Sequence, residues 1–297
     1  MAVSGTWENM GKTEKNIGVS VAGVALTHPS RLVFPELGIT KEQLARYYET
    51  VGKWMLPHLE QRPLTIVRCP ENWRQCFFQR HPLENDAERP VESASPQREN
   101  SANDHLMVDS LQSLVRFVQI GVLEFHTWGA RADKLDRPDR MIFDLDPAPD
   151  LPWNRVVDAA LLVKKILDEI GLASFVKTTG SKGFHVVVPL RRGRTWDEIK
   201  AFSSAVGGHL AALFPDRFTS KVAKEQRIGK VYVDVLRNTA EATAVAAFST
   251  RALPGASIST PITWDELARG IRSDAWASPD FTDTFFKHTV DFRIVLG

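Results

Sequence analysis

Residues 141–146, Met-Ile-Phe-Asp-Leu-Asp, have the pattern of a β-strand in which apolar and acidic side chains alternate. Because successive side chains on a strand point to opposite faces, Phe143 and Leu145 share one face. Asp144 and Asp146 share the other, about 7 Å apart along the strand. Such a strand buries its apolar face and presents two carboxylates on the opposite one, where divalent cations can bind. An acidic strand end that only leads into a turn is the simpler alternative.

A second acidic strand strengthens this interpretation. Residues 230–236, Lys-Val-Tyr-Val-Asp-Val-Leu, place three valines on one face and Asp234 on the other. An aspartate inside such a strand is costly unless it is paired or binds metal. Together with Asp144 and Asp146 it supplies what a two-metal site needs to bridge an attacking 3′ hydroxyl and a nucleoside triphosphate. The ions expected at an all-oxygen site are two divalent cations, Mn²⁺ or Mg²⁺.

Helical and strand periodicities interleave along the rest of the chain. Apolar residues at helical spacing predict helices over residues 40–59, with Thr40 as the N-cap, and over residues 110–119, 153–170 and 196–213. Short β-branched and aromatic runs predict strands over residues 63–68, 123–128, 141–146, 175–178, 184–188, 230–236 and 244–248. The order lacks a strict βαβ rhythm, so it predicts a mixed α/β (α+β) fold.

Composition narrows the class of protein. With 297 residues and 43% hydrophobic content, the chain can bury a substantial core. It has neither a long apolar run nor the pattern of a secretory signal, so we expect a cytoplasmic protein with no membrane contact. The presence of only two cysteines, Cys69 and Cys76, argues against a disulfide scaffold and fits a reducing cytosol, and their spacing matches no zinc motif. Since the net charge is only +1, any nucleic-acid site must be a local basic patch.

No linker divides the chain. Residues 1–16 are polar and aperiodic, and we expect a flexible tail there. Residues 17–297 are expected to form one domain. Within it, residues 85–104 are polar with almost no apolar side chains, which predicts a mobile excursion longer than ordinary connections.

The turn between the predicted strands 175–178 and 184–188 reads Thr-Gly-Ser-Lys-Gly. Its glycines let backbone amides approach a ligand, while Thr179 offers a hydroxyl and Lys182 a charge. It is not a Walker loop, and an ordinary tight turn uses the same residues. His185 follows on the next strand and points away from the apolar side, although a histidine that is merely hydrogen-bonded is the simpler alternative.

Basic residues at positions 221, 224, 227 and 230 recur just before the strand that carries Asp234. A solvated charged surface is the usual explanation for such a run. Because the charge of a triphosphate must be neutralised near the carboxylates, Arg227 and, after the last predicted strand, Arg251 are candidates. Phe77 and Phe78 are adjacent on an extended segment, so both cannot face the core, and an exposed ring can stack on a base. Core packing is the alternative for these rings.

The order of these motifs resembles that of the archaeo-eukaryotic primase superfamily. Over about residues 31–265 the chain is similar to the polymerase domain of bacterial DNA ligase D, from non-homologous end joining. The segments that carry the resemblance are RLVFPELGITKEQLARYY, RMIFDLDPAPDLPW, FVKTTGSKGFHVVVPL, KVYVDVLRN and STPITWDEL. The resemblance implies a primase-polymerase fold, with an RRM-like catalytic sheet packed on an N-terminal module. It also implies Mn²⁺-favoured, template-directed addition of nucleotides, often ribonucleotides, to 3′ ends at DNA breaks or gaps.

The same resemblance implies roles for individual residues. The metals would be held by Asp144, Asp146 and Asp234. The incoming nucleotide would be held by His126 at its sugar and by Thr179, Lys182, His185, Arg227, Arg237 and Arg251. The DNA would be held by Arg31 and Lys41 at the downstream 5′ phosphate, by Arg68 nearby, and by Phe77 and Phe78 at template bases. The implied partners are DNA ends, nucleoside triphosphates, Ku, and ligase and phosphoesterase domains, all in the bacterial cytoplasm at the nucleoid.

The chain departs from the family pattern at two places. Residues 238–243, Asn-Thr-Ala-Glu-Ala-Thr, replace a Gly- and Arg-rich turn, and Thr179 stands where many relatives have serine. Neither ligase nor 3′-phosphoesterase motifs are present. Two alternatives remain. A nucleotide-sugar glycosyltransferase with a manganese-binding Asp-x-Asp would account for Asp144 and Asp146 but not for Asp234. A non-catalytic DNA-end binding module would not need all three carboxylates.

Overall fold

The computed structural model describes residues 18–81 and 105–275. The predicted tail over residues 1–16 and the predicted excursion over residues 85–104 lie outside this part of the chain. The helices are α1 (Lys41–Leu59), α2 (Leu111–Gln119), α3 (Trp153–Glu169), α4 (Trp196–Leu213) and α5 (Trp264–Ala268). The strands of the two large sheets are β5 (Leu64–Arg68), β6 (Phe77–Gln79), β7 (Val122–Trp128), β8 (Arg140–Pro147), β9 (Phe175–Thr178), β10 (Phe184–Pro189), β11 (Phe218–Thr219), β12 (Val231–Asp234), β13 (Thr243–Val245) and β14 (Pro261–Ile262). Two short hairpins precede them, β1 (Ser20–Val21) with β2 (Val24–Ala25) and β3 (Leu32–Phe34) with β4 (Ile39–Thr40).

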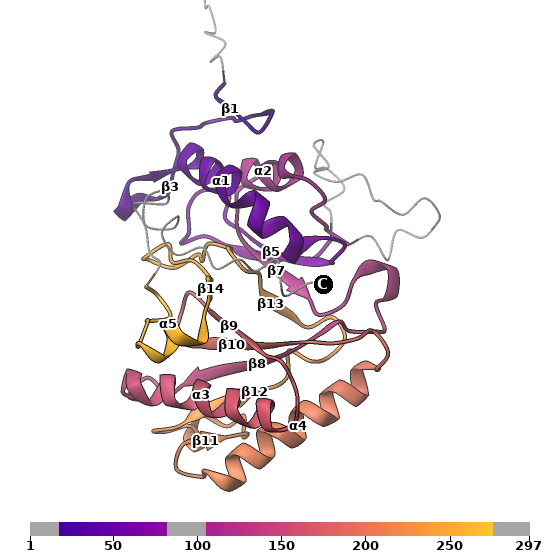
Figure 1. Cartoon of the computed structure of the whole chain (residues 1–297). Helices are drawn as coiled ribbons and strands as arrows, with labels where there is room; N and C mark the ends of the chain where they lie inside the picture. The colour runs from indigo at the N-terminus through magenta and orange to yellow at the C-terminus, as the bar shows by residue number, and fades with distance from the viewer. Residues whose placement is uncertain (1–17, 82–104, 276–297) are drawn as a thin grey trace, which may run out of the picture.

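Two sheets lie between two pairs of helices (Figure 1). The four-stranded sheet has the order β13-β7-β5-β6, and α1 and α2 cover its outer face. The six-stranded sheet has the order β11-β12-β8-β10-β9-β14, and α3 and α4 cover its outer face. The inner faces of the two sheets are turned toward each other. Helices pack on the outer face of each sheet, so the chemistry-bearing side chains of each inner face point into the space between the sheets.

The six-stranded sheet contains the RRM-like arrangement that the resemblance implied. The chain runs β8-α3-β9-β10-α4-β12, and these strands lie in the order β12-β8-β10-β9. All three pairings among them are antiparallel. This is the split βαβ arrangement of ferredoxin-like folds, here extended by β11 and β14. The predicted mixed α/β fold is therefore confirmed.

Burial along the strands follows the alternation predicted from the sequence. Phe143 and Leu145 of β8 and Val233 of β12 are fully buried in the core beneath α3 and α4. On the other sheet, Phe125 of β7 and Ile66 of β5 are buried beneath α1 and α2. The residues that alternate with these along each strand therefore point to the inner faces.

The predicted elements agree with the structure to within a few residues. Thr40 caps α1 as predicted, because its hydroxyl accepts from the Gln43 amide and the Gln43 side chain accepts from the Thr40 amide. The clearest error is the strand predicted over residues 244–248, which ends at Val245. The chain leaves the ladder there, and Phe248 has a φ of 67°, in the left-handed region that a strand does not use. No described helix is long and apolar enough to cross a membrane.

Cys69 and Cys76 form a disulfide, a pairing that the sequence did not predict. The antiparallel pairing of β5 with β6 sets Arg68 opposite Phe77. The next residues along the two strands are the cysteines, whose Cα atoms are 4.2 Å apart. This proximity depends on the hairpin register, which the sequence alone did not reveal.

We expect reduction of this disulfide to lower the free energy of unfolding by about 2 kcal/mol, because the bridge closes a short loop and so restricts the unfolded chain. Urea denaturation with and without a phosphine reductant measures the change. The Cys76→Ser variant is the control and should not respond to reductant. A wild-type midpoint that is the same under both conditions would contradict the expectation.

Candidate active site

Three carboxylates meet on the inner face of the six-stranded sheet. Asp234, the last residue of β12, lies directly across from Asp144 of β8, and Asp146 is two residues further along β8. One oxygen atom from each carboxylate lies within 4.8 Å of the other two. Among the described residues this is the only group of three or more His, Cys, Asp or Glu side chains with such geometry. The triad can therefore bind a metal ion, and its all-oxygen donor set suits a hard divalent cation.

The electrostatics of the triad also favour a cation. Burial, and then the charges of Asp144 and Asp234, raise the pKa of Asp146 to about 6. Burial raises the pKa of Asp234 as well. Burial alone would do the same at Asp144, but His185 and Arg237 outweigh it and hold the pKa of Asp144 at about 2. Like charges this close repel one another, and a bound cation would neutralise them.

Two predicted nucleotide ligands contact the triad directly. His185 is opposite Asp144 in the pairing of β10 with β8, and its Nε2 lies 3.4 Å from the Asp144 Oδ1. Arg237 donates from Nε to the Asp144 Oδ2 at 3.2 Å. Burial, and then the Lys177 charge, lower the pKa of His185 to about 4, so the ring is neutral at pH 7. Both residues therefore orient Asp144 in this structure.

The turn between β9 and β10 is tightly packed. The Thr179 hydroxyl donates to the carbonyl of Gly183 and accepts from two amides of the same turn. It therefore braces the turn, and only Lys182 extends into solvent. Gly180 has a φ of 66°. A Cβ on Gly183 would lie 1.9 Å from the carbonyl oxygen of Leu145, between the two aspartates of β8.

The remaining basic candidates reach the triad or its turn from different elements. The Arg227 guanidinium stacks on the Tyr232 ring at 3.8 Å, on the strand that ends in Asp234. Arg251 donates from Nε to Glu124 at 3.1 Å and from Nη1 to the carbonyl of Thr179. The structure thus places Arg227 beside the strand that ends in Asp234 and Arg251 beside the turn between β9 and β10.

The predicted sugar-binding residue, His126, lies on the inner face of the opposite sheet. Its Nε2 is 2.7 Å from the Glu124 Oε2, two residues earlier on β7. The Phe78 ring is 6.3 Å from the His126 ring and is 73% exposed, while Phe77 is also exposed. Both rings of β6 are thus available for stacking, because the strand is short and lies at the edge of its sheet.

The residues predicted to bind the 5′ phosphate differ in how far they are buried. Lys41 is only 1% exposed, and its Nζ donates to the carbonyl of Thr27 at 2.8 Å. The Lys41 amide donates to the carbonyl of Arg31, so the two residues are adjacent. Arg31 is partly exposed, and its buried Nε has no hydrogen-bond partner among the described residues. Arg68 donates from Nε to the carbonyl of Ile120 at 2.9 Å.

Comparison with known proteins identifies the family. A model of the LigD primase-polymerase domain matches residues 40–291. The chain belongs to this family. It is 41% identical over 249 residues to the multifunctional non-homologous end joining protein LigD of Pseudomonas aeruginosa, covering 84% of this chain and 30% of that protein. It is 28% identical over 243 residues to the bifunctional LigD of Bacillus subtilis, covering 81% of this chain and 39% of that protein. The chain therefore spans about a third of the length of these LigD relatives.

A solved LigD structure has the same fold. The polymerase domain of Mycobacterium tuberculosis ligase D, determined in complex with DNA, superposes with a TM-score of 0.75 at 28% identity. The match covers 82% of this chain and 88% of that one. It confirms the predicted resemblance to the LigD polymerase domain, and a nucleotide-sugar glycosyltransferase is not favoured.

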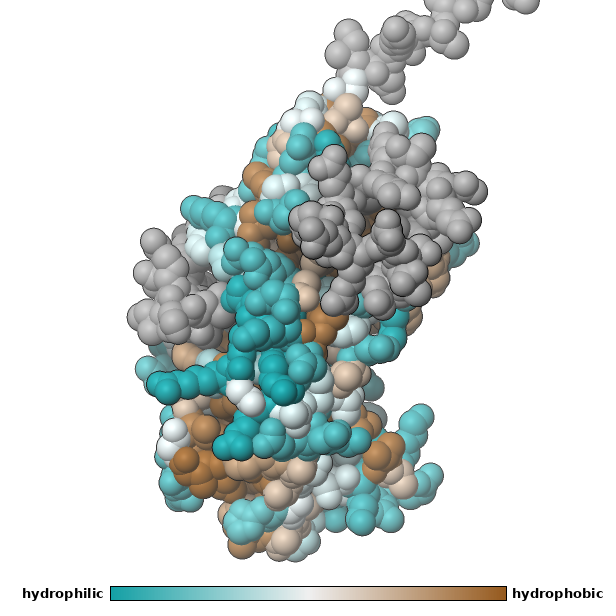
Figure 2. All heavy atoms as spheres, turned by 90° about the vertical axis from the view of Figure 1, so that its right-hand side faces the viewer, coloured by the Kyte–Doolittle hydropathy of each residue, from teal (hydrophilic) through white to brown (hydrophobic). Residues whose placement is uncertain are grey.

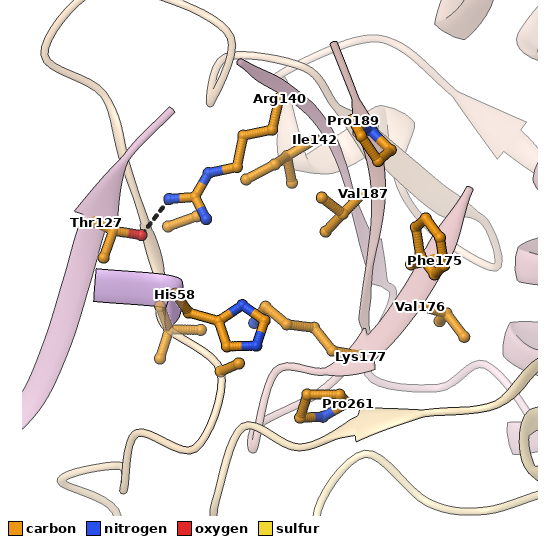
Figure 3. Close-up of a pocket in the computed structure, with 13 residues that line it drawn as sticks. His58, Thr127, Arg140, Ile142, Phe175, Val176, Lys177, Val187, Pro189 and Pro261 are labelled. Carbon is orange, nitrogen blue, oxygen red and sulfur yellow. Dashed lines mark hydrogen bonds between the residues drawn. The ribbon is translucent and has the colours of Figure 1, made fainter. Parts of the chain in front are cut away.

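Glu124, the carboxylate that joins His126 to Arg251, was not among the residues predicted from the sequence of this LigD domain. A cavity between the two sheets was likewise not predicted (Figure 3). Three basic side chains point into this cavity: His58 from α1, Arg140 from β8 and Lys177 from β9. Much of the remaining lining is apolar. A carboxylate inside a buried strand was the signal for Glu124, the same signal that drew attention to Asp234.

The surroundings of His58 lower its pKa. Burial, and then the charges of Arg140, Arg62 and Lys177, lower the pKa of His58 to about 3. The unfolded chain takes up a proton at this residue below about pH 6.5, and the folded chain does not. The free energy of unfolding therefore falls as the pH drops from about 6.5 toward 3, by as much as about 1.4 kcal/mol per pH unit.

We expect His58→Gln to remove this part of the pH dependence. Between pH 7 and pH 5, the wild-type protein should lose about 1–2 kcal/mol more stability than the variant, as measured by urea denaturation. His209→Gln is the matched control, because His209 is exposed on α4. Equal slopes for the wild type and His58→Gln would show that the cavity does not perturb this histidine.

One face of the molecule carries a hydrophilic band. Figure 2 shows a continuous hydrophilic band on the side that carries the segment between β7 and β8. Ion pairs stabilise this segment, including Arg192 with Asp133 at 2.6 Å and Arg62 with Asp139 at 2.7 Å. The segment between β7 and β8 is thus held by ion pairs at the junction of the two halves.

Proposed function

We propose that this chain is a metal-dependent nucleotidyltransferase that adds nucleotides to the 3′ end of a DNA strand, directed by a template, at breaks or gaps. The observation that carries the proposal is the buried triad of Asp144, Asp146 and Asp234 in a chain of the LigD polymerase family. Residues 17–297 act as one primase-polymerase domain in this proposal. The two LigD relatives described above are named as end-joining proteins, which supports the same setting for this chain.

Two divalent ions, Mn²⁺ or Mg²⁺, would be held by the three aspartates and would supply Lewis-acid activation of the 3′ hydroxyl and charge neutralisation of the triphosphate. The protein residues have separate tasks. Arg237 and His185 orient Asp144, as their contacts in this structure suggest. Lys182, Arg227 and Arg251 would neutralise the triphosphate, and the turn braced by Thr179 would present its backbone amides to it.

On the opposite sheet, His126 would lie at the sugar and Phe77 and Phe78 would stack on template bases. Base stacking tolerates any sequence, which suits an enzyme that must accept any DNA end. The proposed partners are DNA ends with a template strand and a downstream 5′ phosphate, nucleoside triphosphates, Ku, and ligase and phosphoesterase domains. The proposed location is the bacterial cytoplasm, at the nucleoid.

Primer extension tests this function. A gapped duplex with one unpaired template base is incubated with each nucleoside triphosphate in turn, with Mn²⁺, with Mg²⁺, or with a chelator. We expect addition of the nucleotide complementary to the template base, and none with the chelator. Addition of nucleotides regardless of the template base would show that the reaction is not directed by a template. DNA binding without any addition would favour the non-catalytic DNA-end module.

A separate prediction concerns the downstream 5′ phosphate, for which we propose Arg31, Lys41 and Arg68 as ligands. Arg31→Ala should weaken binding of a gapped duplex with a 5′ phosphate by about tenfold, since a charge-assisted hydrogen bond to phosphate contributes roughly 1.5 kcal/mol. Binding of the same duplex with a 5′ hydroxyl should change little. Arg31 is a cleaner probe than Lys41, because truncating a fully buried lysine would also leave a cavity.

Fluorescence anisotropy at moderate salt measures both affinities. Lys53→Ala is the control, because it removes one positive charge from the exposed face of α1, where Lys53 lies over Trp54. If Arg31→Ala weakens both duplexes equally, Arg31 provides only general attraction to DNA.

A further inference from the structure

Glu124 is a buried carboxylate that receives three hydrogen bonds. Its Oε2 is 2.7 Å from the His126 Nε2 and 3.1 Å from the Arg251 Nε, and its Oε1 accepts from the Ala252 amide at 2.6 Å. The residue is only 5% exposed. Removing a buried carboxylate from three donors is costly, so this position is strongly specified.

Charge explains why the carboxylate is ionised. Burial raises the pKa of Glu124, but the hydrogen bond from His126 and the charge of Arg251 outweigh burial and keep it below its usual value. Burial lowers the pKa of His126, although Glu124 opposes this. At pH 7 the pair is therefore a carboxylate beside a neutral imidazole.

This charge state determines which ring nitrogen of His126 carries the proton. A carboxylate can only accept a hydrogen bond, so the Nε2 that faces Glu124 must be the protonated nitrogen. The Nδ1 is then an acceptor, and no described residue forms a hydrogen bond with it. An acceptor at this position fits a ligand group that donates, such as a sugar hydroxyl.

Glu124 also joins the two sheets. It lies on β7 of the four-stranded sheet, and its partner Arg251 donates to the carbonyl of Thr179 at the turn between β9 and β10 of the other sheet. The Ser257 hydroxyl donates to the carbonyl of Gly180 in the same turn. A change at Glu124 can therefore reach both the sugar side and the phosphate side of the proposed nucleotide site.

We propose that Glu124 is a positioning residue that holds His126 with Nδ1 as an acceptor for the 2′ hydroxyl of the incoming nucleotide, and holds Arg251 against the turn between β9 and β10. The inference rests on the proposed function. It assigns to one carboxylate the preference for ribonucleotides, because a site built to accept a hydroxyl discriminates against a ligand that lacks it.

Glu124→Gln is the most direct variant. The amide keeps the size of the side chain but places a donor where one acceptor was, so it cannot satisfy His126, Arg251 and the Ala252 amide together. We expect the ratio of ribo- to deoxyribonucleotide addition, measured as kcat/KM on one gapped duplex, to fall about tenfold. Glu169→Gln, the same change at an exposed ion pair of α3, is the control and should leave the ratio unchanged.

A double-mutant cycle separates positioning from bracing. In a His126→Ala background, Glu124→Gln should have no further effect on the ratio, because its action passes through the imidazole. A role in bracing the fold would instead lower addition of both nucleotides by the same factor in either background. Glu124→Asp, which keeps the charge but shortens the reach, serves if the glutamine variant does not fold, and should also lower the ratio.

NMR tests the tautomer without any activity. Long-range ¹H–¹⁵N correlation spectra of the protein, with His126 assigned from a His126→Gln variant, should show a proton on Nε2 in the wild type and lose that signature in Glu124→Gln. A wild-type Nδ1–H tautomer would overturn the inference. So would a wild-type enzyme with no ribonucleotide preference, or an unchanged ratio in Glu124→Gln. All three results are compatible with template-directed primer extension, so the proposed function would stand.

Discussion

Asp234→Ala and Asp144→Ala should each lower nucleotide addition by on the order of 10³-fold or more, while affinity for gapped DNA changes little. The reason is that the triad serves the chemistry, whereas phosphate and stacking contacts elsewhere supply most of the affinity. Removing one carboxylate leaves two that cannot hold the cations in the same arrangement. Single-turnover primer extension measures the rate, and anisotropy measures the affinity.

Measurements of stability distinguish a loss of catalysis from a loss of folding in these variants. Burial, and then the charge of Asp144, raise the pKa of Asp234 against the opposing Leu236 amide and Arg237, so burial disfavours its ionised form. We therefore expect Asp234→Ala to unfold at the same urea concentration as the wild type or at a higher one. Asp158→Ala, on the exposed face of α3, is the control for loss of a charge. Wild-type rates of nucleotide addition in either triad variant would contradict the assignment of these carboxylates as metal ligands.

Gly183→Ala should lower both activity and stability. The added Cβ would lie 1.9 Å from the Leu145 carbonyl oxygen and 3.0 Å from its carbonyl carbon. These are backbone atoms of β8 between Asp144 and Asp146, so neither strand can yield without moving the triad. Overpacking of this kind costs about 1–3 kcal/mol or more, and we expect about 3 kcal/mol here. A shift of the triad should lower nucleotide addition by on the order of 10²-fold.

Gly193→Ala is the matched control, because nothing lies within 4 Å of its added Cβ. Thermal unfolding and primer extension should leave the control close to the wild type and place Gly183→Ala well below it. If Gly183→Ala kept wild-type activity, the close approach of β8 to the turn would have no importance for the site.

The sequence predicted most of the fold because its main elements have strong local patterns. The helix that begins after Thr40 and the helix over residues 196–213 have both apolar periodicity and a capping residue, and both have the predicted extent. The missed elements were short. The hairpin of β1 and β2 and the five-residue helix α5 are each too small for a periodic pattern, although Thr263 and Glu266 form a capping box at α5.

The site was predicted where the chemistry follows from strand alternation alone. The carboxylates of β8 and β12 point to one face in any sheet that buries the valines and phenylalanines. Distances between residues on different strands could not be predicted from the sequence, because they depend on the register of strand pairing. Hence the pairing of Cys69 with Cys76, the burial of Lys41 and the link from Glu124 to Arg251 appeared only in the structure.

The path of the chain between the two sheets has a consequence for its synthesis. β13 follows β12 along the chain but pairs with β7 of the first sheet, and β14 then returns to pair with β9 of the second. A nascent chain that ends before residue 243 leaves the edge of β7 that pairs with β13 exposed, and one that ends before residue 261 leaves the edge of β9 that pairs with β14 exposed. The four-stranded sheet should therefore reach its native hydrogen bonding only after β13 has left the exit tunnel, and the six-stranded sheet only after β14 has done so.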